Sequence, residues 1–248
     1  MEGYPEKQKV VHVLPDELLE VSGITHLYDN TIAAINDEEG ILFLLNLNND
    51  SMRSFKFKGK GDYEELVKTD SSYFILDSDG DLYEVKPPYT EHVTYKFDIE
   101  GKFEFESLVW YKKLNKLVVI TKEQRKKSKS GITAYSFDLT RKTFDKEPFF
   151  EITLKEIFVK LENYNAECKP SAAALHPLSK RLYILASVGK VILECSPEGK
   201  IERIFKINPG HFPQPEGITF ASNGDMYISN EGLDGKATIL KYPYVAKK

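Results

Sequence analysis

The stretch that decides the fold is residues 215–248, PEGITFASNGDMYISNEGLDGKATILKYPYVAKK. It holds three apolar segments, one that opens at 216–218 and two at 226–229 and 237–242, separated by turn residues, and each is typical of a β-strand. No fourth segment follows them. Residues 8–14, QKVVHVL, are rich in β-formers and stand before the first copy of the pattern without a partner. We therefore predict that this N-terminal segment supplies the missing fourth strand.

The same pattern recurs along the chain: a small or acidic residue opens an apolar cluster, and turns and further apolar segments follow. The spacings between successive openings are 42, 42, 65 and 45 residues. Three of the four agree with a repeat of about 40 to 45 residues, the length of a four-stranded propeller blade. The five openings are Ser22-Gly23-Ile24, Glu64-Glu65-Leu66, Glu106-Ser107-Leu108, Ser171-Ala172-Ala173 and Glu216-Gly217-Ile218.

We therefore predict one all-β domain, a five-bladed β-propeller of four-stranded antiparallel blades, closed by its N-terminal strand. The blades are expected at about 22–60, 61–100, 101–165, 168–208 and 213–248, the last completed by 8–14. The long third interval is attributed to a basic loop at 122–130 and a segment with helical spacing at 154–163. The third blade's last strand is placed at 144–152. A six-bladed propeller, with a degenerate blade between 122 and 168, is the alternative.

Composition narrows the class of partner. The chain has 248 residues, a formal net charge of −4 and no strong basic field, which argues against nucleic acid. No apolar run reaches membrane-spanning length, and the first residues lack the features of a secretory leader. A processed form of an exported protein is compatible with this. Two cysteines, Cys168 and Cys195, favour buried thiols over one disulfide and offer no zinc site.

Two sets of residues should meet at one mouth of the channel, because the end of each second strand lies beside the start of the first. The openings contribute Ser22, Glu64, Glu106, Ser171 and Glu216, and the second strands end at Asp37, Ser78, Lys122, Ser187 and Glu231. Carboxylates dominate this mouth, and Lys122 is its one cation. The predicted ligand-binding residues are Asp37, Glu64, Glu106, Lys122, Glu216 and Glu231.

Three interpretations of this acidic mouth stay open. The glutamates could accept hydrogen bonds from backbone and water and so tie neighbouring blades together. They could instead bind a hard cation such as Ca²⁺ or Mg²⁺, with Glu64, Glu106 and Glu216 as the candidate ligands. A pair of carboxylates with Lys122 beside them could also catalyse a reaction.

Other motifs carry less information. Residues 77–81, DSDGD, resemble the start of a calcium loop but lack its downstream glutamate, so a tight turn is expected. The five histidines are scattered, and no nucleophile elbow or phosphate loop occurs. The basic run 125–129, RKKSK, is typical of a solvated loop, with contact to an anionic surface as the alternative. The balance of these motifs favours binding over catalysis.

At the residues already quoted, the chain resembles the SdiA-regulated (YjiK-like) family of bacterial envelope propellers. The matching pieces span nearly the whole chain. They are Ser22-Gly23-Ile24, Asn36-Asp37-Glu38-Glu39-Gly40, Gly61-Asp62-Tyr63-Glu64, Ser78-Asp79-Gly80-Asp81-Leu82-Tyr83, His176-Pro177 with Leu182-Tyr183-Ile184, Gln214-Pro215-Glu216-Gly217-Ile218-Thr219-Phe220 and Ser229-Asn230-Glu231-Gly232. Esterase-like phytase propellers and NHL-type repeats are more distantly similar.

The resemblance implies a periplasmic or cell-surface binding domain, often held by an N-terminal anchor or lipid, in which bound calcium would be unsurprising. The chain departs from the pattern by showing no anchor and by carrying Glu65 where glycine is usual. Our leading hypothesis is a non-enzymatic, envelope-associated domain that binds a small ligand or an envelope protein at the acidic mouth. The alternative is a hydrolase of phosphate or carboxylic esters that uses the same mouth.

Overall fold

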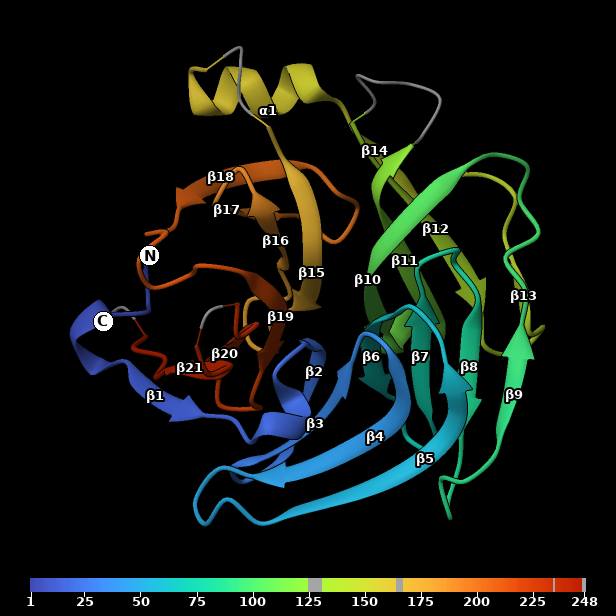
Figure 1. Ribbon diagram of the computed structural model, residues 1–248. Helices are drawn as coiled ribbons and strands as arrows, with labels where there is room; N and C mark the ends of the chain where they lie inside the picture. The colour runs from blue at the N-terminus through green and yellow to red at the C-terminus, as the bar shows by residue number, and fades with distance from the viewer. Residues whose placement is uncertain (125–130, 164–166, 234, 247–248) are drawn as a thin grey trace.

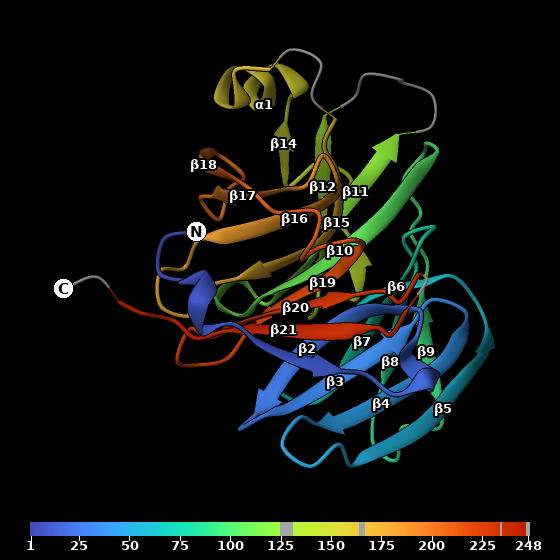
Figure 2. The same ribbon diagram turned by 60° about the vertical axis from the view of Figure 1, so that its left-hand side comes forward.

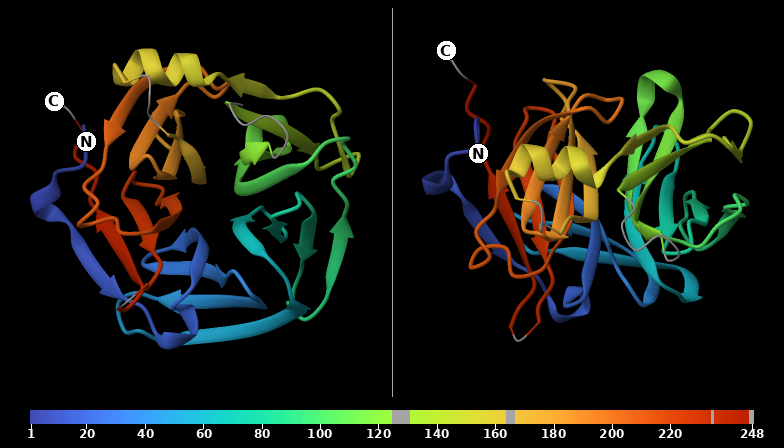
Figure 3. Two further views of the ribbon diagram at one scale, coloured as in Figure 1. Left: turned by 45° about the horizontal axis from the view of Figure 1, so that its top comes forward. Right: turned by 90° about the horizontal axis from the view of Figure 1, so that it is seen from above.

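The strands of the protein form a ring of antiparallel sheets around a central axis. A computed structural model describes residues 1–124, 131–163, 167–233 and 235–246, and in these ranges five sheets are present. Figure 1 shows the sheets side by side, and the tilted view in Figure 3 shows the closed ring. The predicted five-bladed propeller is confirmed, and the six-bladed alternative is wrong because the strands described between residues 122 and 168 all belong to the third sheet.

Each blade runs from an inner strand beside the axis to an outer strand at the rim. Blade 1 contains β2 (Val21–Tyr28), β3 (Thr31–Asn36), β4 (Glu39–Asn46) and β5 (Met52–Lys60). Blade 2 contains β6 (Tyr63–Lys68), β7 (Tyr73–Asp77), β8 (Leu82–Val85) and β9 (His92–Tyr95). Blade 3 contains β10 (Phe103–Tyr111), β11 (Lys116–Gln124), β12 (Ile132–Asp138), β13 (Thr143–Phe144) and β14 (Phe150–Ile152). Blade 4 contains β15 (Lys169–Leu175), β16 (Leu182–Val188), β17 (Val191–Cys195) and β18 (Ile201–Lys206). Blade 5 contains β19 (Pro215–Phe220), β20 (Met226–Asn230), β21 (Thr238–Tyr242) and β1 (Val10–Val13). Short 3-10 turns lie at Glu6–Gln8, Asp16–Leu18 and Lys112–Leu114.

The N-terminal strand closes the ring as predicted. Strand β1 pairs antiparallel with β21, with Val11 opposite Leu240 and Val13 opposite Thr238. The two strands lie side by side in both ribbon views (Figures 1 and 2). The side chain of Val13 is 59% exposed, whereas Leu14, the next residue, is 2% exposed. Backbone pairing therefore sets the register of the closing strand, and flanking residues such as Leu14 supply the apolar burial.

Among the residues that the structure describes, the core consists of five apolar clusters, one in each seam between neighbouring blades. Strand β3 shows why the sequence produces this arrangement. Ile32 and Ala34 pack into the seam with blade 5, while Ala33 and Ile35 pack into the seam with blade 2. Because side chains of a strand alternate between its faces, a strand covered on both faces is apolar throughout. Cys168 and Cys195 lie in the seam between blades 3 and 4 as buried free thiols.

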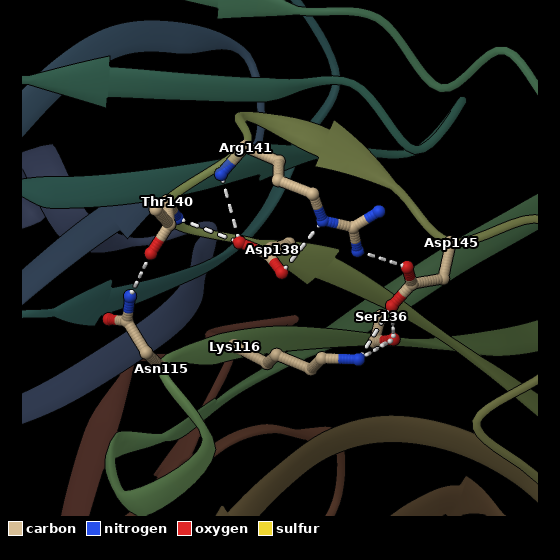
Figure 4. A network of polar contacts seen from close by, with 7 residues as sticks. All are labelled: Asn115, Lys116, Ser136, Asp138, Thr140, Arg141 and Asp145. Atoms are coloured by element: carbon tan, nitrogen blue, oxygen red, sulfur yellow. Dashed lines mark hydrogen bonds and ion pairs between the residues drawn. The ribbon is translucent and has the colours of Figure 1, made fainter.

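The outer strand of blade 3 differs from the prediction. The expected strand at 144–152 is interrupted, and the two short strands β13 and β14 both pair with β12. Asp145 lies at the interruption, where its carboxylate accepts hydrogen bonds from Lys116 Nζ and Ser136 Oγ, each at 2.6 Å (Figure 4). Arg141 also contacts this carboxylate. Pro148, which has no N–H to donate, falls within the same gap.

The predicted helical insertion is present as α1 (Leu154–Leu161), which begins with a capping box formed by Thr153 and Glu156. Its fully buried Ile157 packs into the seam between blades 3 and 4. Of the predicted basic loop, residues 125–130 lie outside the described part of the chain. Within the described ranges, no helix combines the length and apolar character needed to cross a membrane.

Candidate functional site: an acidic mouth of the channel

A β-bulge at the same repeat position of every inner strand aims side chains at the axis. The antiparallel register skips Glu64 in β6, Glu106 in β10, Ser171 in β15 and Glu216 in β19. In β2 it skips both residues between Val21 and Ile24. A bulge leaves the extra residue outside the ladder and turns its side chain away from the sheet. The residues predicted to open each repeat are therefore the bulge residues.

The structure brings the six predicted ligand-binding residues together. They line one cavity of about 480 Å³ at a mouth of the channel, to which blades 1, 2, 3, 4 and 5 all contribute. From the two predicted sets, Ser22 and Ser187 also line it, but Ser78 and Ser171 do not. Ser171 Oγ instead donates to the Pro215 carbonyl at 2.8 Å, and Ser78 Oγ donates to Asp62. The six are Asp37, Glu64, Glu106, Lys122, Glu216 and Glu231.

The cavity also contains polar residues that sequence reasoning missed. Most of them stand two positions before a bulge residue, where the two-residue period of a strand places a side chain on the same edge. Glu104, at the equivalent place in blade 3, has its carboxylate 3.5 Å from Lys122 Nζ. Applying the period of two to the five openings would have found this second tier. The missed lining residues of this kind are Glu20, Asp62, Lys169 and Gln214, and Lys190 joins them from blade 4.

Of the three lysines that line the cavity, Lys122 is the one in contact with a bulge glutamate among the described residues. Lys122 Nζ contacts the carboxylate of Glu106, which is only 7% exposed. Ser187 Oγ donates to Glu216 Oε1 at 3.3 Å. Within the described ranges, Glu64 makes no hydrogen bond or ion pair. The mouth therefore has unequal glutamates: one paired with a lysine, one held by a hydroxyl and one without a partner.

Burial and mutual repulsion raise the pKa values of these carboxyl groups. Burial, followed by repulsion from Glu106, raises the pKa of Glu64 to about 9 and that of Glu216 to about 8. Burial also raises the pKa of Glu106, but the neighbouring Lys122 ammonium limits the rise to about 7. At neutral pH, Glu64 and Glu216 therefore keep their protons, and Glu106 is close to its midpoint.

The two carboxylates that follow the second strands of blades 1 and 5 obey the same rule. Burial, and next the charge of Glu20, raises the pKa of Asp37, whose Oδ1 is buried without a hydrogen-bond partner. Burial, and next the charge of Asp37, raises the pKa of Glu231. A positively charged group that entered this cavity would lower all of these pKa values and release protons.

A resident metal ion does not fit this arrangement as it stands. No group of three His, Cys, Asp or Glu side chains in the described part of the chain is placed to hold one. Lys122 supplies the positive charge beside Glu106 instead. Elsewhere, residues 77–81 form the expected tight turn, in which Gly80 has a φ of +96° and Asp77 Oδ1 accepts from the Asp79 N–H at 3.3 Å.

Comparisons with known proteins assign the family. The model of the SdiA-regulated family matches residues 6–232. This chain, a five-bladed β-propeller by its fold, therefore belongs to the SdiA-regulated family. A search of curated proteins finds no match to the sequence.

Solved structures with the same architecture share little sequence with this chain. A regucalcin from Agrobacterium tumefaciens, described as a calcium-binding protein, is 12% identical with a TM-score of 0.58, and 96% of each chain is covered. A luciferin-regenerating enzyme is 12% identical with a TM-score of 0.56, again over 96% of each chain. A protein described as a "putative gluconolactonase" is 9% identical with a TM-score of 0.55, over 88% of this chain and 72% of its own. At these identities the likeness concerns the fold alone.

Proposed function

We propose that this protein is a binding domain whose acidic mouth receives a positively charged group, either a divalent cation or an ammonium or guanidinium on a larger ligand. The observation that carries the proposal is the convergence of Glu64, Glu106 and Glu216 from three blades in one cavity, with Lys122 as the ion-pair partner of Glu106. Burying several carboxyl groups together costs free energy unless a cation compensates them. A ligand cation would supply that compensation.

The cavity volume bears on the kind of ligand. About 480 Å³ is far more than a single ion needs and lies in the usual range for small-molecule sites. A divalent ion would have to displace Lys122 from Glu106, whereas an organic cation could bind beside Glu64 with Lys122 in place. Calcium, which the family resemblance suggests, is thus one version of the proposal, with Glu64, Glu106 and Glu216 as its candidate ligands.

The test compares thermal stabilisation by three probes: Ca²⁺, Mg²⁺ and 1,4-diaminobutane. A ligand at one hundred times its Kd should stabilise the folded wild type by about 2.7 kcal/mol. The variant carrying Glu106→Gln and Glu216→Gln should lose this response, while the exposed-site control Glu100→Gln should keep it. If none of the probes changes the melting temperature of the wild type, the cation-binding proposal is refuted. A response to the diamine alone would retain the binding role and reject the metal version.

One observation favours a second candidate, a hydrolase. Glu64 and Glu106 have pKa values of about 9 and about 7, so one carboxyl group holds a proton at neutral pH while the other can accept one. Such a pair suits general acid–base catalysis. The excess of carboxylates disfavours phosphate esters and leaves neutral carboxylic esters or lactones as substrates. Turnover of such substrates that Glu106→Gln abolishes would establish this candidate, and silence across an ester and lactone panel would reject it.

We also propose that the protein works in the cell envelope, either in the periplasm or at the cell surface, where a lipid or membrane anchor on the full-length form would hold it. The family resemblance supports this placement, since the related propellers are exported. Cell fractionation of the native full-length protein, probed with an antibody against the propeller, tests it. Recovery from the cytosolic fraction would contradict it.

A further inference from the structure

The channel contains a second compartment behind the acidic mouth. A cavity of about 140 Å³ is lined only by residues of the five inner strands, β2, β6, β10, β15 and β19. Nine of its fifteen lining residues are aliphatic, with Leu66, Leu108 and Ile218 among them. This compartment shares no lining residue with the acidic mouth. It is therefore a separate space on the axis.

Glu65 stands where the other inner strands carry small residues. The equivalent positions hold Gly23, Ser107, Ala172 and Gly217. A Cβ atom at Gly23 would lie 2.5 Å from Glu65 Oε1 and 2.6 Å from Glu65 Cα, so only glycine in blade 1 leaves room for this side chain. The glutamate is thus accommodated by a matched glycine in the neighbouring blade.

Glu65 is 1% exposed, and its two oxygen atoms differ. Oε1 accepts a hydrogen bond from the Leu66 N–H at 2.9 Å, whereas Oε2 is buried without a partner. Burial without a nearby cation raises the pKa of Glu65 well above its usual range, so the group is a neutral acid that can donate as well as accept. Leaving a buried polar atom without a hydrogen-bond partner costs about 1–3 kcal/mol of folding free energy. A bound ligand that supplied the missing partner would remove this cost.

A second unpartnered donor lines the same compartment. Trp110, the single tryptophan of the chain, has a buried indole Nε1 without a hydrogen-bond partner. Lys68 also lines the compartment, but its ammonium donates to the Thr69 carbonyl at 2.6 Å and lies 5.4 Å from the Tyr73 ring centroid. Glu65 and Trp110 are thus the two lining residues whose polar groups are buried and lack a partner in the described part of the chain.

We propose that this compartment binds a small uncharged molecule with a carbonyl or hydroxyl group on a short aliphatic body. Its polar group would pair with Glu65 and Trp110, and its aliphatic part would contact the leucine and isoleucine side chains. Since one water occupies about 30 Å³ of liquid, the space corresponds to four or five waters, or to one organic molecule of about six heavy atoms. A cation is disfavoured because Glu65, the one acidic residue of the walls, is neutral. An anion is disfavoured because Lys68, the one basic residue of the walls, directs its ammonium to the Thr69 carbonyl.

The test uses isobutyramide, which has an amide on a branched three-carbon body, and isobutyrate, its anionic analogue of the same shape. Because the chain has one tryptophan, the indole N–H of Trp110 gives a single resonance in a ¹H–¹⁵N spectrum. Isobutyramide at millimolar concentrations should shift this resonance saturably. Isobutyrate should bind at least about tenfold more weakly, because its carboxylate would lose hydration beside the aliphatic side chains while the Lys68 ammonium stays with the Thr69 carbonyl.

Two variants separate a site from a general solvent effect. Ala174→Leu enlarges a side chain that lines the compartment and should abolish the saturable shift. Ala246→Leu makes the same chemical change at an exposed position and should leave the titration unchanged. Glu65→Leu keeps the volume but removes the polar group, and should weaken isobutyramide about tenfold. The proposal is overturned if isobutyramide leaves the Trp110 resonance unshifted, if isobutyrate binds as tightly, or if Ala174→Leu binds like the wild type.

Discussion

Replacing Glu64 with glutamine should change how the stability of the propeller depends on pH. The pKa of Glu64 is about 9 in the folded protein, against about 4.3 for an unfolded glutamate. Between about pH 5 and pH 8 the folded chain therefore holds one proton at this site that the unfolded chain lacks. Because the pKa of Glu64 is higher in the folded than in the unfolded chain, the stability that this group contributes is fully present at low pH and is lost as pH rises toward the folded pKa.

The magnitude follows from the proton count. One proton difference gives a slope of about 1.4 kcal/mol per pH unit, so Glu64 alone removes about 2.7 kcal/mol of stability between pH 5 and pH 7. Glutamine keeps the shape of the neutral acid and cannot ionise. In Glu64→Gln the free energy of unfolding should therefore decline with pH less steeply than in the wild type, by about 1.4 kcal/mol per unit.

Urea denaturation followed by far-UV circular dichroism at pH 5, 6 and 7 measures these slopes. Glu100→Gln, at an exposed position outside the mouth, is the matched control and should run parallel to the wild type. If Glu64→Gln and the wild type show the same slope over this range, then the carboxyl group is ionised in the folded protein. The account of the acidic mouth as a proton-holding cavity would then be wrong.

Three further perturbations test other parts of the structure. Lys122→Met should raise the pKa of Glu106 above about 7, whereas Lys122→Arg should preserve it, because arginine keeps the positive charge. Titration of the ¹³C carboxyl resonance by NMR measures this pKa, and an unchanged value in Lys122→Met would contradict the role of the ion pair. Leu14→Ala, just after the closing strand, should lower the free energy of unfolding by about 2–4 kcal/mol, because Leu14 is 2% exposed. Val13→Ala, at the exposed neighbouring position, should lower it by less than about 0.5 kcal/mol. Equal losses in chemical denaturation would contradict the role of Leu14 in anchoring the closing strand. Partial burial raises the pKa of Asp145, but hydrogen bonds from a lysine, a serine and an arginine outweigh it and hold the pKa below its usual range, so this group stabilises the fold at neutral pH and ceases to do so in acid. Asp145→Asn should therefore melt lower than the wild type at pH 7, and the difference should narrow as pH falls below about 4, the pKa of an unfolded aspartate. Equal melting at pH 7 would refute the role of this network.

The closing strand and the bulge residues show how far repeat reasoning extends. The unpaired segment before the first repeat and the missing strand of the last one were enough to predict the pairing of Val11 with the end of the chain. The same alignment of repeats placed Glu64, Glu106 and Glu216 at one mouth. Both inferences use only local periodicity and the requirement that a ring be closed.

Other features escaped prediction because they depend on partners distant in the sequence. The last strand of blade 3 is interrupted where Asp145 gathers Lys116 and Ser136 from two other strands, and no local pattern reports such a convergence. Glu65 also appeared only as a departure from the family pattern. Its burial against Gly23 and the lack of a partner for its Oε2 atom depend on the position of the neighbouring blade, which no local pattern in the sequence reports.

The sequence by itself determined the number of blades, their strand order, the manner of closure and the residue types at the channel mouth, because these follow from the period of the pattern along the chain. Only the tertiary structure decided which carboxyl groups are buried, which of them Lys122 neutralises and which keep a proton. Those properties depend on distances between blades and on the exclusion of water, and the free energy of a charge changes far more with these than with its position in the chain.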